Sequence, residues 1–282
     1  MNYRHAYHAG NHADVMKHVV LARVIEHMKK KAKPFRVIDA HAGIGVYNLM
    51  GIEAGKTGEW QGGIAKMAAP FSPDVEAILA PYRACLAALN PSGEMLRYPG
   101  SPDIAARLMR DIDRMVVNEL HPEDFKLLEG HFQRDRRVTA TMLDAEASVK
   151  ASLPPPERRG LILIDPPYET KDETERALRM LAQGLRRFSS GVFMLWYPLK
   201  ADDIAARVAA ETAAMGVPAV LRIELRIREA FKGGGLAGSG MIIVNPPWTM
   251  DNDLRLLMPA LAQRLGLGTW GHGTVDWLVP PK

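Results

Sequence analysis

The tetrapeptide Asp165-Pro166-Pro167-Tyr168 follows the apolar run 161–164 and has the chemistry needed to bind an exocyclic amino group. Its two prolines hold φ near about −65° and remove two backbone donors, so the carbonyl oxygens here remain available as acceptors. At the carboxyl end of a buried parallel strand, where open α/β sheets bind ligands, the segment would present a carboxylate, a carbonyl and a phenol ring. An NH₂ group on a flat base, such as N6 of adenine, fits this set.

A second segment, Asn245-Pro246-Pro247-Trp248, follows the apolar run 242–244 and has the same pattern. We interpret it as a rigid exit of the chain from its last strand, because proline cannot continue a central strand. Position in the chain favours residues 165–168 as the active segment, since they directly follow the second and third acid-bearing strands.

Asp39, Glu119 and Asp144 each end a short apolar segment ahead of Asp165. We expect Glu119 to accept two hydrogen bonds from a ribose diol. We expect Asp144 to accept one from an adenine amino group, beside a backbone donor at Ala145. Any one of these acids could instead cap a helix. Four of them in order favour a nucleoside cofactor over capping alone.

The glycine loop that follows the first predicted strand reads Asp39-Ala40-His41-Ala42-Gly43-Ile44-Gly45. Glycine permits positive φ and a close approach of the backbone to a ligand. A dinucleotide site would need a third glycine in the pattern G-x-G-x-x-G, and this chain lacks it. S-adenosylmethionine, which has no phosphate, suits the loop better, although an ordinary tight turn is an alternative for the loop taken alone.

Beyond a helical start, strand-like and helix-like segments alternate, which is typical of a doubly wound parallel sheet. The predicted strands are residues 35–39, 114–119, 137–144, 161–165 and 192–196. The predicted helices are residues 11–30, 104–110, 123–132, 173–188 and 202–215. A helical stretch at 75–89 lies in a proline-containing region that we interpret as a small helical insertion. Residues 220–229 and 241–244 predict an antiparallel hairpin that closes the edge of a seven-stranded sheet.

The chain has 282 residues, 47% of them hydrophobic, and a net charge of only +4. A single cysteine, Cys85, excludes a disulfide framework and a cysteine-based zinc site. No apolar stretch is long enough to span a membrane and the N-terminus does not resemble a signal peptide, so we expect a cytoplasmic protein. Basic clusters such as Arg136-Arg137 are compatible with a polyanionic partner, with solvated helix faces as the alternative.

The N-terminal region contains four histidines between residues 5 and 18. Asn11 and Asp14 form a variant capping box that predicts a helix start, and Asp14, Lys17 and His18 would share one face of that helix. Without a nearby cysteine, hydrogen bonding is favoured over metal binding for these histidines, and we expect no metal site. Tyr3 would act as a lid over a bound ligand, unless the terminus frays.

The chain resembles the ribosomal large-subunit RNA methyltransferase J family over nearly its whole length. The resemblance rests on residues 8–18, 39–45, 98–102, 119–122, 161–168 and 240–248, of which the histidine-rich block is the most specific. It implies an α/β fold with a Rossmann-like class I methyltransferase sheet and an inserted small helical subdomain. We expect residues 1–50 and 99–282 to form the methyltransferase domain, with the N-terminal helix, and 51–98 to form the subdomain.

The resemblance also implies roles for individual residues. The expected cofactor contacts are His18, His41, Ser101, Glu119, Asp144, Ala145 and Asp165. The residues expected to engage substrate are Tyr3, His5, Lys17 and Tyr168, with Asp165 as the catalytic residue. The family usually has glycine where this chain has Ala145. A backbone donor survives this change, but a positive φ at this position would strain alanine and weaken cofactor binding.

The predicted activity is transfer of a methyl group from S-adenosylmethionine to N6 of one adenine in 23S rRNA. The expected partner is 23S rRNA, naked or at an early stage of assembly, and we expect a monomer that binds no membrane. The alternatives are a DNA adenine-N6 methyltransferase and a nucleic-acid-binding protein with an inactive methyltransferase fold. A nicotinamide dehydrogenase is disfavoured by the missing third glycine.

Overall fold

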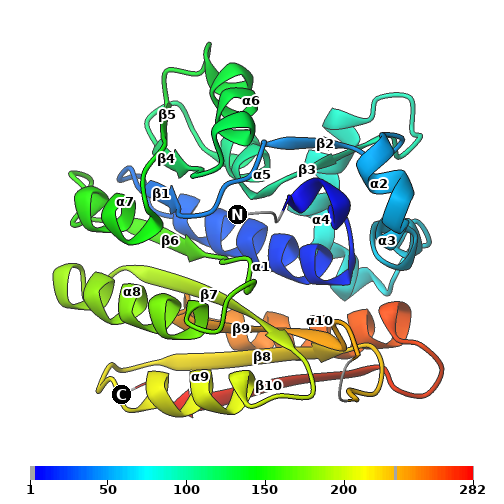
Figure 1. Ribbon diagram of the computed structural model, residues 1–282. Helices are drawn as coiled ribbons and strands as arrows, with labels where there is room; N and C mark the ends of the chain where they lie inside the picture. The colour runs from blue at the N-terminus through cyan, green and yellow to red at the C-terminus, as the bar shows by residue number, and fades with distance from the viewer. Residues whose placement is uncertain (1–3, 232–233, 282) are drawn as a thin grey trace.

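The computed structural model describes residues 4–231 and 234–281. Its centre is an eight-stranded sheet with the order β10-β8-β9-β7-β6-β1-β4-β5 (Figure 1). The strands are β1 (Arg36–Asp39), β4 (Arg114–Asn118), β5 (Val138–Thr141), β6 (Gly160–Ile164), β7 (Val192–Leu199), β8 (Val220–Arg226), β9 (Gly238–Val244) and β10 (His272–Val279).

Five neighbouring strands of this sheet, β7, β6, β1, β4 and β5, are parallel. Their carboxyl ends therefore meet at one edge of the sheet, where α/β proteins of this class bind ligands. All five residues of β6 are buried, as expected for a central strand covered on both faces. The fold is the predicted α/β arrangement with a Rossmann-like parallel sheet.

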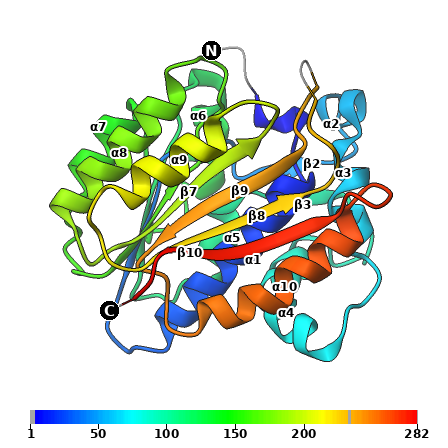
Figure 2. The same cartoon turned by 90° about the horizontal axis from the view of Figure 1, so that it is seen from below.

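Helices cover both faces of the sheet (Figure 2). On one face α7 (Ala145–Ser152), α8 (Glu173–Arg187) and α9 (Ile204–Ala213) pack with apolar residues of the sheet into one core. The helices packed in the opposite core are α1 (His12–Lys29), α4 (Pro73–Leu89), α5 (Ser101–Leu108), α6 (Pro122–Phe132) and α10 (Met250–Leu265).

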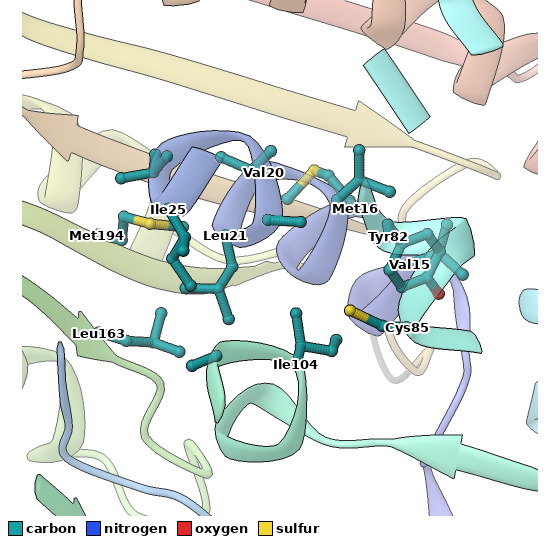
Figure 3. Packing of buried hydrophobic residues seen from close by; sticks show 14 of the residues in the cluster. Val15, Met16, Val20, Leu21, Ile25, Tyr82, Cys85, Ile104, Leu163 and Met194 are labelled. Atoms are coloured by element: carbon teal, nitrogen blue, oxygen red, sulfur yellow. The ribbon is translucent and has the colours of Figure 1, made fainter. Parts of the chain in front are cut away.

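Helix α1 is the most buried helix of the second layer, and every residue from His12 to Ala22 in it is buried. Figure 3 shows Val20, Leu21 and Ile25 between the sheet residues Leu163 and Met194 and the neighbouring helices. Asn11 caps the helix as predicted: its Oδ1 accepts hydrogen bonds from the backbone N–H groups of residues 13 and 14, at 2.9 and 3.0 Å. The charged residues of its first half, Asp14 and Lys17, consequently lie inside the protein and need partners there.

The region expected to form an insertion lies between two short strands, β2 (Val46–Asn48) and β3 (Arg97–Pro99), which pair antiparallel. Between them the chain forms α2 (Ile52–Thr57), α3 (Glu59–Gly62), the 3₁₀ helix η2 (Ile64–Met67) and α4. Apolar residues of α4 belong to the same core as those of α1 and α10. The division of the chain at residues 51–98 stays a prediction.

Two details of the predicted sheet are wrong. The hairpin of β8 and β9 forms, but it does not close the edge, because β9 pairs with β7 and β10 covers β8. The sheet thus has eight strands rather than seven. In strand β10 only Val275 is buried, and apolar and polar residues do not alternate regularly along it, so the strand gives a weak sequence pattern.

The third predicted strand, residues 137–144, is too long. Strand β5 ends at Thr141, and Asp144 instead caps α7 by accepting a hydrogen bond from the backbone N–H of Glu146 at 3.0 Å. The backbone of Leu143 pairs with the side chain of Asn118 rather than with a strand. In the described part of the chain, none of the helices combines the length and the hydropathy needed to cross a membrane.

The cap of α1 can be tested by replacing Asn11 with alanine. We expect Asn11→Ala to lower the free energy of unfolding by about 1 kcal/mol or more, because two buried N–H groups at the start of the helix lose their acceptor. Ser72 precedes α4 but makes no side-chain capping bond, so Ser72→Ala is the matched control and should change stability far less. Denaturant titration of both variants measures the difference. Equal losses would show that the Asn11 bonds contribute nothing.

Candidate active site

A cavity of about 440 Å³ lies at the carboxyl edge of the parallel strands. Ten of the residues predicted for the site line it: His5, Lys17, His18, His41, Ser101, Glu119, Asp144, Ala145, Asp165 and Tyr168. The remaining one, Tyr3, lies outside the described residues. Side chains separated by more than a hundred positions in the sequence thus surround one space of the size that small-molecule sites have.

Lys17 of α1 connects the helix to the tetrapeptide. Its ammonium group contacts Asp14 Oδ1 at 2.9 Å and also donates to Asp165 Oδ2, while its own side chain is only 4% exposed. Burial by itself lowers the pKa of Lys17, but the two carboxylates outweigh it and raise the pKa above its usual value. The lysine therefore stays charged, and it neutralises part of the negative charge at Asp165.

Asp14 is the hub of the N-terminal contacts, as its predicted position on the shared helix face suggested. Its Oδ2 accepts from the backbone N–H of Gly10 at 2.9 Å and lies 2.9 Å from His5 Nε2. His5 belongs to the 3₁₀ helix η1 (His5–Tyr7). Burial raises the pKa of Asp14, but His5 and Lys17 outweigh it, and the pKa lies well below its usual value. The N-terminal segment is thereby attached to the same carboxylate that holds Lys17.

His18, which is buried, and His41, which is partly buried, are two further histidines of the site. His18 Nδ1 lies 2.8 Å from the hydroxyl of Tyr98, which in turn lies 3.0 Å from the hydroxyl of Tyr82. His41 Nδ1 accepts a hydrogen bond from the backbone N–H of Asp165 at 3.2 Å. Burial lowers the pKa of His18 to about 3 and that of His41 to about 4, so both rings are neutral near pH 7.

The glycine loop has the backbone conformation that its sequence predicted. Gly43 and Gly45 have φ of 62° and 89°, in the left-handed region. A Cβ on Gly43 would lie 2.0 Å from the hydroxyl of Tyr47, so no larger residue fits there. The carboxylate of Glu119 accepts from the backbone N–H of Gly43 at 3.0 Å and from that of His121 at 2.8 Å. Burial raises the pKa of Glu119.

Asp39 lies behind the cavity rather than in its lining. It is 1% exposed, and its carboxylate accepts a hydrogen bond from the Ser101 hydroxyl at 2.6 Å. Burial raises the pKa of Asp39 to about 6. Because the hydroxyl hydrogen of Ser101 is used by Asp39, the Ser101 oxygen faces the cavity as an acceptor.

Asp144 and Ala145 form the opposite wall. Asp144 Oδ2 accepts from Arg176 at 2.6 Å, and Ala145 is the first residue of α7. Ala145 has no positive φ, so replacing the usual family glycine with alanine causes no backbone strain here. The weaker cofactor binding that strain would cause is therefore not expected.

Tyr168, the last residue of the tetrapeptide, is part of the cavity lining. Its φ is 52°, which is unusual for a residue with a side chain, and its hydroxyl donates to the carbonyl of Trp196 at 2.9 Å. The rings of Tyr168 and Trp196 are 5.6 Å apart in an edge-to-face arrangement. Burial raises the pKa of Tyr168, so the phenol stays protonated.

The second tetrapeptide is at the opposite edge of the sheet. Strand β9 runs antiparallel to β7, and Val244 pairs with Phe193 near the start of β7. The Asn245 side chain donates to the carbonyls of Ser189 and Gly191, both at 2.8 Å, and Trp248 is 81% exposed. Residues 245–248 are therefore far from the cavity, in line with their interpretation as a chain exit.

Sequence reasoning did not single out several residues of the lining, among them Asn118, Trp196 and Lys200. Asn118 directly precedes Glu119 at the end of an apolar strand, and a polar residue at that position is a signal that could have been used. Trp196 gave no such signal, because an aromatic residue within an apolar strand is expected to belong to the hydrophobic core. Over residues 4–231 and 234–281, no cluster of three His, Cys, Asp or Glu side chains is arranged to bind a metal ion.

Replacing Lys17 with methionine should destabilise the protein by about 3–5 kcal/mol, because Asp14 and Asp165 would be left as buried charges without a cation. The matched control is Lys29→Met. Lys29 pairs with Glu26 on the surface of the same helix, where both side chains are about 30% exposed, and we expect a loss below about 1 kcal/mol. Denaturant unfolding measures both variants, and similar small losses would contradict the structural role of the buried lysine.

Stability should also depend on pH through the buried histidines. Burial lowers the pKa of His12 to about 4, that of His18 to about 3 and that of His41 to about 4. In the unfolded chain these rings titrate near about 6.5, so below that pH the unfolded state binds more protons and the free energy of unfolding falls. Carboxyl groups whose pKa is raised by burial, such as those of Asp39 and Glu119, oppose the trend set by the three histidines.

His12 is the best residue with which to test this linkage. It lies outside the cavity lining, and its Nε2 has no hydrogen-bond partner in the described structure. In His12→Gln, the slope of unfolding free energy against pH between about pH 6.5 and 4 should become shallower by about 1.4 kcal/mol per pH unit. An unchanged slope would contradict a neutral, buried His12.

Comparison with known proteins gives consistent matches over the whole chain. A family model described as "Ribosomal RNA large subunit methyltransferase D, RlmJ" matches residues 32–279. The protein named Ribosomal RNA large subunit methyltransferase J from Escherichia coli (strain K12) is 42% identical over 280 residues, covering 99% of each chain. The protein of the same name from Haemophilus influenzae (strain ATCC 51907 / DSM 11121 / KW20 / Rd) is 40% identical over 284 residues, again covering 99% of each.

A solved structure shows the same fold. The crystal structure of a protein from Legionella pneumophila str. Philadelphia 1 matches with a TM-score of 0.86 and 29% sequence identity, covering 96% of this chain and 98% of that one. The full-length matches and the family model agree with the resemblance seen in the sequence motifs. The chain belongs to the RlmJ family of ribosomal RNA large subunit methyltransferases.

Proposed function

We propose that the protein transfers a methyl group from S-adenosylmethionine to N6 of one adenine in 23S ribosomal RNA. Both curated relatives are named as ribosomal RNA large subunit methyltransferases, which supports the substrate class. The observation that carries the proposal is the position of Asp165. Its carboxylate lies at the carboxyl end of β6, in the cavity, with Lys17 on one side and His41 bonded to its backbone.

The lining of the cavity suits S-adenosylmethionine. Acidic side chains, Glu119 and Asp144, lie at the end formed by β4 and β5, where they would accept from ribose hydroxyls and an adenine amino group and would repel a pyrophosphate. At the end formed by the glycine loop, the Ser101 oxygen would accept from the amino group of the methionine part. His18 and His41, both neutral, would complete this side. When bound, the cofactor supplies an electrophilic methyl group on a sulfonium.

The tetrapeptide would bind the target base. Asp165 and the carbonyl of Pro166 would accept the two hydrogens of the adenine amino group, while Tyr168 stacks on the ring. Adenine N6 is a poor nucleophile because its lone pair is delocalised into the ring. Holding both hydrogens favours a pyramidal nitrogen with its lone pair directed at the methyl group, so catalysis here is mainly positioning and electrostatics.

Adenine N6 would lose a proton after it has accepted the methyl group. Methylation makes the nitrogen strongly acidic, so the Asp165 carboxylate is a sufficient acceptor. Lys17 holds a positive charge beside the Asp165 carboxylate. Burial raises the pKa of Tyr168, so it stays a neutral phenol, and its hydroxyl donates to the carbonyl of Trp196. In this account His5 and Lys17 act by holding the N-terminal segment and Asp165 in place, and Tyr3 would act as part of the same segment.

A paired adenine must leave its helix to reach the cavity, which costs a few kcal/mol. Contacts between basic side chains and phosphates would offset part of this cost. We propose that the substrate is naked 23S rRNA or an early assembly intermediate, because a base is easiest to extrude before the subunit is complete. We also propose that the protein acts as a cytoplasmic monomer.

A DNA adenine-N6 methyltransferase was the alternative, because the tetrapeptide does not distinguish ribose from deoxyribose. It is not favoured, since both full-length relatives are named as enzymes of ribosomal RNA. An inactive methyltransferase fold is also disfavoured, because Asp165, Glu119 and Asp144 all line the cavity.

We expect Asp165→Asn to reduce methyl transfer at least about 100-fold. An amide has one acceptor oxygen instead of two, and it cannot take the proton from the methylated nitrogen. Cofactor binding, measured by calorimetry, should be retained at least in part. Trp248→Ala changes the aromatic residue of the second tetrapeptide, which is exposed at the opposite edge of the sheet, and should leave turnover unchanged. Turnover like that of the wild type in Asp165→Asn would refute the assignment.

A further inference from the structure

Asn118 is a buried polar residue with an unusual position in the sheet. It is the last residue of β4, which lies between β1 and β5, and it is 1% exposed. Its side chain lines the cavity. From this position a single side chain reaches the loops that follow both neighbouring strands.

The Asn118 carboxamide uses all of its hydrogen-bonding capacity. Its Nδ2 donates to the carbonyl of Ala40 at 3.2 Å and to that of Leu143 at 2.9 Å. Its Oδ1 accepts from the hydroxyl of Thr141 at 2.9 Å and from the backbone N–H of Leu143 at 3.1 Å. The carboxamide thus pairs with both backbone groups of Leu143, as a neighbouring strand would, and also holds the glycine loop at Ala40.

The loop that follows β5 has few other anchors. Met142 and Leu143 are 48% and 43% exposed, and their side chains do not enter the core. Asp144 is exposed and its carboxylate is held by Arg176, itself a surface residue. Since the side chains of Met142 and Leu143 do not fix this loop, the hydrogen bonds from Asn118 to Leu143 restrain it between the end of β5 and the cap of α7 at Asp144.

We infer that Asn118 is a positioning residue for the proposed cofactor, because it fixes the distance between the two loops that would hold opposite ends of that molecule. The inference rests on the proposed function. One loop carries Ala40 to Gly43, next to the methionine end, and the other carries Asp144 and Ala145, next to the adenine. Asn118 need not touch the cofactor to set its affinity.

Only asparagine has the required groups at this length. Aspartate has the same shape but no donor for the carbonyls of Ala40 and Leu143, and it would place a carboxylate beside them. Alanine leaves both backbone groups of Leu143 without their partner. Asparagine is therefore required at position 118 for its hydrogen-bonding groups and not only for its volume.

The test compares Asn118→Ala with Asn90→Ala. Asn90 is the matched control because its buried carboxamide also makes hydrogen bonds within the protein, four of them to the backbone of Leu86, Leu96 and Arg97, but it lies outside the cavity lining. The dissociation constant of S-adenosylhomocysteine is measured by calorimetry at a temperature at which both variants are folded. The KM for S-adenosylmethionine and kcat are measured in parallel.

In Asn118→Ala, we expect the dissociation constant and the KM to rise about tenfold or more, the scale on which the loss of buried hydrogen bonds weakens a site. The kcat at saturating cofactor should change much less, because Asp165 is untouched. Asn118→Asp should show the same loss. Asn90→Ala should lower stability without changing either constant.

Unchanged cofactor affinity in Asn118→Ala, or equal changes in both alanine variants, would overturn the inference. If Asn118→Ala does not fold, Thr141→Val removes one of the four bonds at almost constant volume and should raise the dissociation constant about threefold. No change in that variant would overturn the inference as well. Failure of the wild type to bind S-adenosylhomocysteine would instead refute the proposed cofactor.

Discussion

The structure of the site depends on one buried lysine. Lys17 lies inside the protein between Asp14 on its own helix and Asp165 at the end of β6. A buried ammonium is costly unless it is paired, and two buried carboxylates are costly unless a cation lies between them. Each of the three groups is therefore stable only where the other two are. This mutual requirement fixes α1, the N-terminal segment bound to Asp14 and the tetrapeptide relative to one another.

The parallel sheet does the rest of the positioning. Because β1, β4, β5 and β6 run in the same direction, side chains that follow them in the sequence meet at one edge. The glycine loop, the Glu119 carboxylate and the loop before α7 are then joined by hydrogen bonds that cross from one strand end to the next. The resulting cavity separates a polar end suited to a nucleoside from the end where Asp165 and Tyr168 would meet a base. Such separation is what a transfer between two bound molecules requires.

Much of this arrangement could be predicted from the sequence, because it follows from strong local patterns. Apolar runs that end in acidic residues located the parallel strands, and Asn11 located the start of α1. The glycine loop has the positive φ values that its residues indicated. Strand β10 was missed because it is only partly buried and its apolar and polar residues do not alternate regularly. The end of β5 was misplaced. Beyond the end of β5, the Asn118 side chain takes the place of a neighbouring strand by bonding to the backbone of Leu143. The residues of segment 137–144 alone cannot indicate this, because Asn118 lies elsewhere in the sequence.

The central claim is that this chain methylates adenine N6 in ribosomal RNA. It is tested most directly by incubating the protein with labelled S-adenosylmethionine and, in separate reactions, naked 23S rRNA, intact large subunits and duplex DNA. The modified nucleoside is then identified by mass spectrometry. The account predicts label as N6-methyladenosine in naked 23S rRNA and none in DNA. Label in DNA, label in another nucleoside, or no transfer to any of the three would contradict it.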